Sequence, residues 1–220
     1  MRFTDNELNS LRLAVKDKLS PRRYNHTLGV ERAAAMIAEK CAKEPISEIR
    51  AAALLHDITK EFSHEEQLVL IEKYQIKVTE SDLMSPETLH ALTASPYIIE
   101  NYPHFADELV LSAISCHTVG RPDMDVAEAI IFVADFIEEG RTYDVSVRLR
   151  EKLYSELDKS GSILNMVLAL CCAVIESITC TVSHLEEQSM FVHPVTLLTR
   201  DAFIKRRDEI LRLVDSGKRT

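Results

Sequence analysis

Two adjacent side chains that can bind a metal, His56 and Asp57, follow the apolar run "AALL" at residues 52–55. Imidazole and carboxylate groups are ligands for transition metals, and both are costly to bury without a partner. A histidine–aspartate pair also arises by chance in a chain of 220 residues, so the pair alone predicts little. Its meaning depends on where the other histidines and acidic residues fall.

Four more residues of these chemical types occupy positions that face the core of their expected helices. His26 shares a helical face with Val30, His117 and Asp135 each follow an apolar stripe, and His90 lies near the start of its helix. Any one of these residues alone would more often be an ordinary core residue than a ligand. Together, the six residues offset one another's desolvation cost if they surround a cation.

The donor set of four imidazoles and two carboxylates, without a thiolate, suits Fe, Mn, Co, Ni or Zn. Six protein ligands are too many for one catalytic ion with open coordination positions. They favour two metal ions that share a bridging carboxylate.

Composition limits the classes of partner. The net charge of −9 and the sequence pI of about 5.4 argue against nucleic acid or a membrane surface as the partner, because either needs a basic face. An anionic small molecule remains compatible if a local cation holds it. The five cysteines are odd in number and form no CxxC motif, which favours reduced thiols. The first residues form no apolar signal segment, so we expect a cytoplasmic protein.

Helical periodicity covers nearly the whole chain and predicts an all-α fold. Capping boxes at Thr4, Ser63 and Asp125 and the Ser20–Pro21 and Ser85–Pro86 pairs mark helix starts. The expected helices cover about 4–18, 20–43, 47–56, from 63, from 85 (with Pro96 predicted to kink or split it), 107–117, 125–140 (with Gly140 as its C-terminal glycine), 143–157, 162–187 and 195–215.

We expect one domain over 1–220. A metal-binding core at 20–141 would be closed by C-terminal helices at 143–216, which also permit a homodimer. The segment 163–182 is long enough to span a membrane, but Asn165 and Glu176 interrupt it, so it is predicted to be a buried core helix.

The order H…HD…H…H…D resembles the HD-domain superfamily of metal-dependent phosphohydrolases. The flanking motifs look like those of the YqeK family over about residues 10–200: "RRYNHTLGV" (22–30), "ALLHDITK" (53–60), "LHALTA" (89–94), "AISCHTVGRPDM" (113–124), "IIFVADFIEEGR" (130–141) and "HPVTLLTRD" (193–201). Glu139 and Asp201 depart from the residues common in that family, and both lie outside the ligand set.

The resemblance implies an HD-domain helical bundle with additional C-terminal helices and a centre of two metal ions, usually iron. It implies symmetrical hydrolysis of diadenosine tetraphosphate to two ADP by a metal-bridging hydroxide. One metal would be held by His26, His56, Asp57 and Asp135. The other would be held by His90, His117 and Asp57, which would therefore be the bridge. Asp57, Lys60 and Asp135 would be catalytic.

Candidate substrate contacts follow from position. Lys60 lies four residues after His56, and Arg23 lies three residues before His26, so both are expected to reach phosphate. Arg141 is a third phosphate candidate. Thr118 and Gly120 are expected to shape the loop after the fourth histidine, with a positive φ allowed at Gly120.

Other functions remain open at this point. The same fold and metals could act on another nucleotide, such as a guanosine polyphosphate, a dNTP or a nucleoside monophosphate. Related two-iron HD proteins can be oxygenases. The chain could also be a nucleotide-sensing module without catalytic activity. The six filled ligand positions argue against this alternative.

Overall fold

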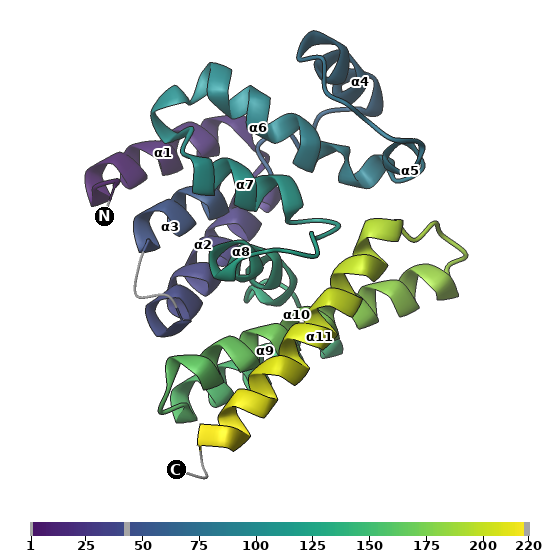
Figure 1. Ribbon diagram of the computed structural model, residues 1–220. Helices are drawn as coiled ribbons and strands as arrows, with labels where there is room; N and C mark the ends of the chain where they lie inside the picture. Colours follow the sequence, from purple (N-terminus) through teal and green to yellow (C-terminus); the bar gives the residue numbers. More distant parts are fainter. Residues whose placement is uncertain (1, 42–44, 218–220) are drawn as a thin grey trace.

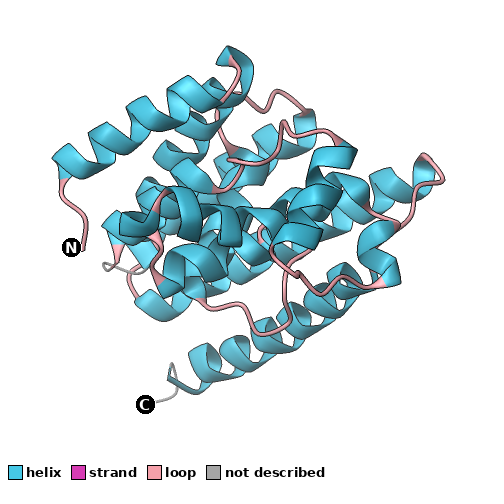
Figure 2. Cartoon of the chain, turned by 90° about the horizontal axis from the view of Figure 1, so that it is seen from above, coloured by secondary structure: helices cyan, strands magenta, loops and turns pink. Residues whose placement is uncertain are grey.

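The computed structural model describes residues 2–41 and 45–217, and within these ranges it contains helices and no strands (Figures 1 and 2). The predicted all-α class is therefore confirmed. The α-helices are α1 (Asp5–Lys18), α2 (Pro21–Cys41), α3 (Ile46–Leu55), α4 (His64–Lys73), α5 (Glu80–Leu83), α6 (Leu89–Asn101), α7 (Glu108–Cys116), α8 (Val126–Ile137), α9 (Asp144–Lys159), α10 (Ile163–Glu187) and α11 (Pro194–Gly217). Two 3₁₀ turns, η1 (Pro86–Thr88) and η2 (Pro103–Phe105), flank α6.

Helices α2, α3, α7 and α8 form the centre of the molecule. Helix α2 packs against α3 and α8, and α7 joins α3 and α8 from the other side. Helix α1 covers α3, while α6 and then α4 extend the bundle beyond α7 (Figure 1). The long helices α10 and α11 pack side by side, and α10 also contacts α8 and α9.

The three predicted capping boxes and the predicted start of the second helix at Pro21 are confirmed. The side chains of Thr4, Ser63 and Asp125 each accept a hydrogen bond from the backbone N–H of a glutamate three residues later, and that glutamate caps in return. Pro21 and Pro194 are the first residues of α2 and α11, where a proline loses no intrahelical hydrogen bond. The expected end of the second helix near residue 43 lies outside the described residues.

The end of α8 differs from the prediction. The helix stops at Ile137, and Glu138 has extended backbone angles (φ −53°, ψ 155°), so Gly140 is not its C-terminal cap. Beyond this end, the Glu138 side chain turns back toward the largely buried ring of His26. Arg150 stabilises this turn by donating hydrogen bonds to the carbonyl oxygens of Ile137 and Glu138.

The segment around α6 also differs in detail. Pro86 starts a 3₁₀ turn rather than an α-helix, and the α-helix begins only at Leu89. Pro96 does not split α6, which continues to Asn101 because neighbouring residues of the helix are buried against the core. The short helix α5, capped by Thr79, had no counterpart among the expected helices.

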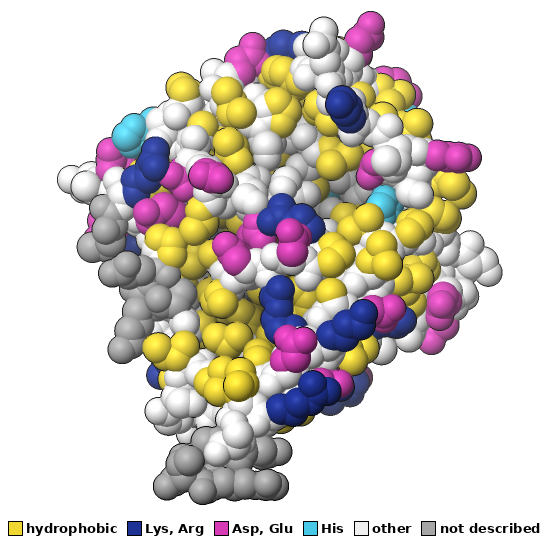
Figure 3. All heavy atoms as spheres, viewed as in Figure 1, with side chains coloured by type: hydrophobic (Ala, Val, Ile, Leu, Met, Phe, Trp, Pro, Cys, Tyr) yellow, Lys and Arg dark blue, Asp and Glu magenta, His cyan; other side chains and the backbone are white. Residues whose placement is uncertain are grey.

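Helix α10 is long and apolar enough to cross a membrane by length and composition alone. In the fold 39% of its most apolar stretch is buried, and α10 contacts α8, α9 and α11, so the predicted core helix is only partly buried. All five cysteines are free thiols, and three of them are buried. On the face shown in Figure 3, lysine and arginine side chains alternate with acidic ones, so that face has no continuous basic area.

Gly120 adopts a positive φ of 78°, as predicted, and a Cβ there would lie 2.7 Å from Cγ2 of Thr199 in α11. We predict that Gly120→Ala lowers the free energy of unfolding by about 1–2 kcal/mol, because a left-handed backbone is costly for a residue with a Cβ. Urea unfolding measures the change. Gly161→Ala is the matched control, since nothing lies within 4 Å of its added Cβ. Equal stability of the two variants would contradict the prediction.

Candidate metal centre

The six residues predicted as metal ligands lie together at the centre of the bundle. Helices α2, α6 and α8 supply three of them from within their length, and the turns that follow α3 and α7 supply the rest. They are His26, His56, Asp57, His90, His117 and Asp135. Four of these residues are buried, whereas the side chains of His26 and Asp135 keep 11% and 24% exposure. The site is therefore a buried polar cluster with one open side.

The Asp57 carboxylate divides the four imidazoles into two pairs. Its Oδ2 atom lies 3.6 Å from Nε2 of His26 and 3.3 Å from Nε2 of His56. Its Oδ1 atom lies 3.2 Å from Nε2 of His90 and 3.8 Å from Nε2 of His117. One oxygen thus faces each pair, which is the arrangement that a bridging carboxylate requires.

The backbone orients two of these imidazoles. Nδ1 of His56 lies 2.7 Å from the carbonyl oxygen of Ala53. Nδ1 of His117 lies 2.6 Å from the carbonyl oxygen of Ile114. A carbonyl oxygen only accepts, so each Nδ1 carries the proton and each Nε2 keeps its lone pair for a cation.

In the other two imidazoles, Nδ1 also faces a hydrogen-bond acceptor. Nδ1 of His90 lies 2.9 Å from the carbonyl oxygen of Glu87. Nδ1 of His26 lies 3.1 Å from Oε1 of Glu138, a buried carboxylate. All four histidines therefore direct Nε2 toward Asp57, and an acceptor on the far side fixes each ring, as is usual for metal-binding histidines.

A metal fits this donor set. Nε2 of His90 and Nε2 of His117 lie 3.0 Å apart, and in the assigned tautomers both carry lone pairs that a shared cation would stabilise. The buried Nε2 of His56 has no hydrogen-bond partner. Donor atoms of His26, His56 and Asp135 lie within 4.8 Å of one another, as do those of His56, Asp57 and His117. Two overlapping groups of ligands thus meet at His56.

The carboxylates remain charged despite their burial. Burial raises the pKa of Asp57, but the neighbouring imidazoles of His56, His117 and His90 outweigh it and hold the pKa well below its usual value. Burial likewise opposes the charge on Asp135, and the hydrogen bond from His26 and the charge of Arg141 hold its pKa well below the usual range. Both groups are available as anionic ligands at neutral pH.

The surroundings of His90 and His26 shift the pKa values of these two imidazoles in opposite directions. Burial lowers the pKa of His90 to about 4, so this ring is neutral and its Nε2 is ready to bind a cation. Burial also disfavours a charged His26, but hydrogen bonds to Asp135 and Glu138 outweigh it and raise the pKa to about 9. Metal binding at His26 must therefore displace a proton from its ring.

The two arginines predicted to bind phosphate each contact one of the ligand carboxylates. Nη1 of Arg23 donates to Oδ2 of Asp57 at 2.6 Å. Nη2 of Arg141 donates to Oδ1 of Asp135 at 2.8 Å, and its Nε donates to the backbone carbonyl of Asp135. Both guanidinium groups keep about a third of their exposure, so they stand between the buried carboxylates and solvent.

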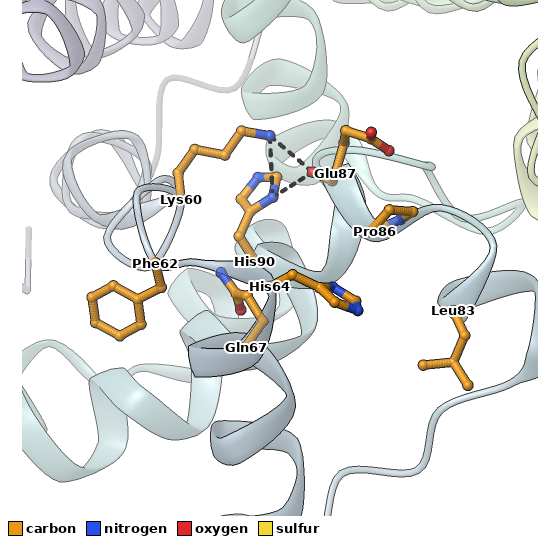
Figure 4. Close-up of a pocket in the computed structure, with 8 residues that line it drawn as sticks. All are labelled: Lys60, Phe62, His64, Gln67, Leu83, Pro86, Glu87 and His90. Atoms are coloured by element: carbon orange, nitrogen blue, oxygen red, sulfur yellow. Dashed lines mark hydrogen bonds between the residues drawn. The ribbon is translucent and has the colours of Figure 1, made fainter.

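Lys60 lies beside His90. Its Nζ atom donates to the carbonyl oxygen of Glu87 at 2.8 Å and lies 3.3 Å from Nδ1 of His90 (Figure 4). Burial lowers the pKa of Lys60, and the charges of Asp57 and Asp135 partly counter this. The structure thus brings all three predicted cations to the rim of the cluster.

A cavity of about 500 Å³, here called the α10 cavity, opens beside the cluster. It reaches the site at Lys60, His117, Asp135 and Arg141, and α8, the start of α9 and α10 form its other walls. Thr118 lines this cavity, and its contact with substrate stays a prediction. Gly120 packs against α11 instead and is not among the residues that line it. Its predicted role is therefore limited to the shape of the loop.

The sequence interpretation missed Glu138. Its Oε2 atom accepts a hydrogen bond of 2.6 Å from the backbone N–H of Gly140, and its Oε1 atom faces His26. A Cβ at Gly29 would lie 2.1 Å from Oε2, so only glycine leaves room for this carboxylate. The glycine in "NHTLGV", three residues after His26, was the one signal in the sequence, and it has meaning only once α2 and α8 are packed together.

An all-helical bundle around a histidine and aspartate cluster defines a class of metal-dependent protein. The HD domain family matches residues 23–140, which is more than half of the chain and includes all six clustered residues. The chain belongs to this family.

Relatives in three bacteria carry the name "Bis(5'-nucleosyl)-tetraphosphatase, symmetrical". The protein of Halalkalibacterium halodurans is 32% identical over 84% of this chain and 90% of its own length. The protein of Bacillus subtilis is 31% identical over 84% and 91%, and that of Staphylococcus aureus is 37% identical over 66% and 74%. The predicted YqeK-like resemblance is confirmed.

A solved structure shares the fold. It is described as a predicted HD superfamily hydrolase involved in NAD metabolism from Clostridium acetobutylicum. The TM-score is 0.77 and the identity 27%, with 90% of this chain and 97% of that chain covered. The likeness therefore extends through the C-terminal helices.

We predict that Glu138→Ala weakens metal binding about 10- to 100-fold, because the ring of His26 loses the carboxylate that orients it. Gly29→Ala should have the same effect by displacing that carboxylate. Titration with a competing chelator measures the affinity. The control is Glu139→Ala, a neighbour whose side chain is 65% exposed. If Glu138→Ala binds metal as tightly as this control, the positioning role is wrong.

Proposed function

We propose that this protein hydrolyses diadenosine tetraphosphate symmetrically to two ADP. The observation that carries the proposal is the division of four imidazoles into two pairs by the two oxygens of Asp57. The printed names of three relatives support the substrate. The cations at the rim support an anionic ligand, and the α10 cavity has a volume within the range of small-molecule sites.

We propose two metal ions, and iron as the metal. His26, His56, Asp57 and Asp135 would hold one ion, and Asp57, His90 and His117 would hold the other. Four imidazoles and two carboxylates suit iron as well as Mn, Co, Ni or Zn, and no described cysteine belongs to the cluster. We also propose a cytoplasmic location, because free thiols are typical of proteins in that compartment.

When bound, the metal ions would lower the pKa of a coordinated water and neutralise charge on the phosphoryl group. The chain's own residues position the substrate. Lys60 and Arg141, which both line the α10 cavity, would hold phosphate oxygens beside the reacting phosphorus. A water oxygen would bond to one β-phosphorus as the bridge to the other β-phosphate breaks. The departing ADP carries charge on its terminal phosphate, so the reaction needs no strong general acid.

Product analysis tests the function. The metal-loaded protein, given micromolar diadenosine tetraphosphate, is expected to release ADP as the sole nucleotide product, measured by anion-exchange chromatography. Asp57→Ala, with its unfolding temperature checked, is the inactive control. Release of ATP with AMP would mean asymmetrical cleavage. Failure to release ADP would reject the proposed substrate.

We predict that Lys60→Ala lowers kcat/KM for this substrate about 10- to 100-fold, because a charge-assisted contact with phosphate is lost. The matched control is Lys77→Ala, which removes an exposed lysine. Steady-state kinetics at fixed ionic strength provide the comparison. Equal kcat/KM values for the two variants would remove Lys60 from the phosphate contacts.

A further inference from the structure

A second cavity of about 460 Å³ lies on the far side of Lys60 from the α10 cavity. We call it the α4 cavity, and its lining residues are Lys60, Phe62, His64, Gln67, Leu83, Pro86, Glu87 and His90 (Figure 4). Lys60 and Glu87 line both cavities. His90, one of the clustered imidazoles, lines the α4 cavity, whereas His117 lines the α10 cavity. The two cavities therefore reach the cluster from two sides.

The walls of the α4 cavity suit a flat, largely apolar group. The ring of His64 extends toward Pro86 and Leu83 (Figure 4). His64 is exposed, and Leu83 is 47% exposed although it is a large hydrophobic residue. Phe62 lines the same cavity and is held by an edge-on contact with Tyr97. These groups offer stacking and apolar surfaces of the kind that bind nucleobases.

The floor of the cavity is fixed. Gln67 is buried, and its Nε2 donates to the carbonyl oxygen of Thr59 at 2.6 Å. Its Oε1 accepts from Oγ1 of Thr93 at 2.6 Å. Both ends of the amide are thus engaged within the protein, and the floor is preformed. Lys60 supplies positive charge at the end of the cavity that faces the cluster.

Symmetrical cleavage imposes a geometric requirement. The broken bond lies at the middle of the substrate, so two nucleosides must extend from the cluster, each at the end of two phosphates. If one of them enters the α10 cavity while the reacting phosphorus lies at the cluster, the other needs a second site beside the cluster. A third cavity beside His26 is lined by four arginines, a charge that suits phosphate: Arg22, Arg23, Arg32 and Arg141. Its one aromatic residue, Tyr143, also lines the α10 cavity, so this third cavity offers no separate aromatic surface for the second base.

We propose that the α4 cavity binds the second nucleoside of the dinucleoside polyphosphate, with its base between His64 and the Leu83–Pro86 wall and its phosphates passing Lys60. This assignment rests on the proposed function. It makes the symmetry of the products a consequence of two nucleoside subsites that flank one cluster.

The test uses the metal-loaded protein and ADP, the expected product. Equilibrium dialysis should find two ADP per wild-type chain and one per chain of the double variant His64→Ala/Leu83→Ser. The same variant should raise KM for diadenosine tetraphosphate about tenfold through the loss of base stacking. Val69→Ser, which changes an exposed α4 residue outside the cavity, should behave as the wild type.

Photolabelling with 8-azido-ADP provides a readout that does not depend on the variants. Labelled peptides are expected from residues 62–67 or 83–87 in addition to the α10 cavity. One ADP per wild-type chain, or an unchanged KM with two ADP in the double variant, would overturn the α4 subsite. Wild-type turnover is scored separately, so a chain that fails to hydrolyse the substrate would reject the proposed function instead.

Discussion

The structure depends on the burial of one carboxylate. Asp57 is almost completely buried, and a carboxylate in that position is very unfavourable unless charged or hydrogen-bonding partners surround it. Arg23 donates a hydrogen bond to it, and four imidazoles direct Nε2 toward it, so a cation bound between them would complete the compensation. If any one of these groups were removed, the negative charge of Asp57 would be compensated incompletely. The central helices are therefore packed so that their polar residues meet at this point.

The ends of α3 and α7 fix the orientation of two imidazole rings. The last carbonyl groups of a helix have no intrahelical donor. His56 and His117 occupy the capping positions of α3 and α7 and donate Nδ1–H to carbonyl oxygens in those last turns. One contact thus satisfies a carbonyl and fixes the ring that projects Nε2 into the cluster. This explains why a histidine and an aspartate stand together where an apolar helix ends.

Much of this was predictable from the sequence. The all-α class and most helix starts follow from local periodicity and capping residues, because these depend on near neighbours. The convergence of six ligand-type residues was expected from their core-facing positions and from the order that they share with the HD family. The early end of α8 and the role of Glu138 do not, because they arise from the contact of Glu138 with His26 and Gly29, more than a hundred residues away. Helix α5 is too short for periodicity to reveal. The single domain over 1–220 and the homodimer stay predictions.

The central claim is that the two oxygens of Asp57 serve two separate metal ions. Native mass spectrometry of the protein, purified without chelator and reconstituted with iron, counts the metal ions bound to each chain. The account predicts two ions in the wild type and at most one in a folded Asp57→Ala variant. A single ion in the fully reconstituted wild type, or two ions retained by Asp57→Ala, would contradict it.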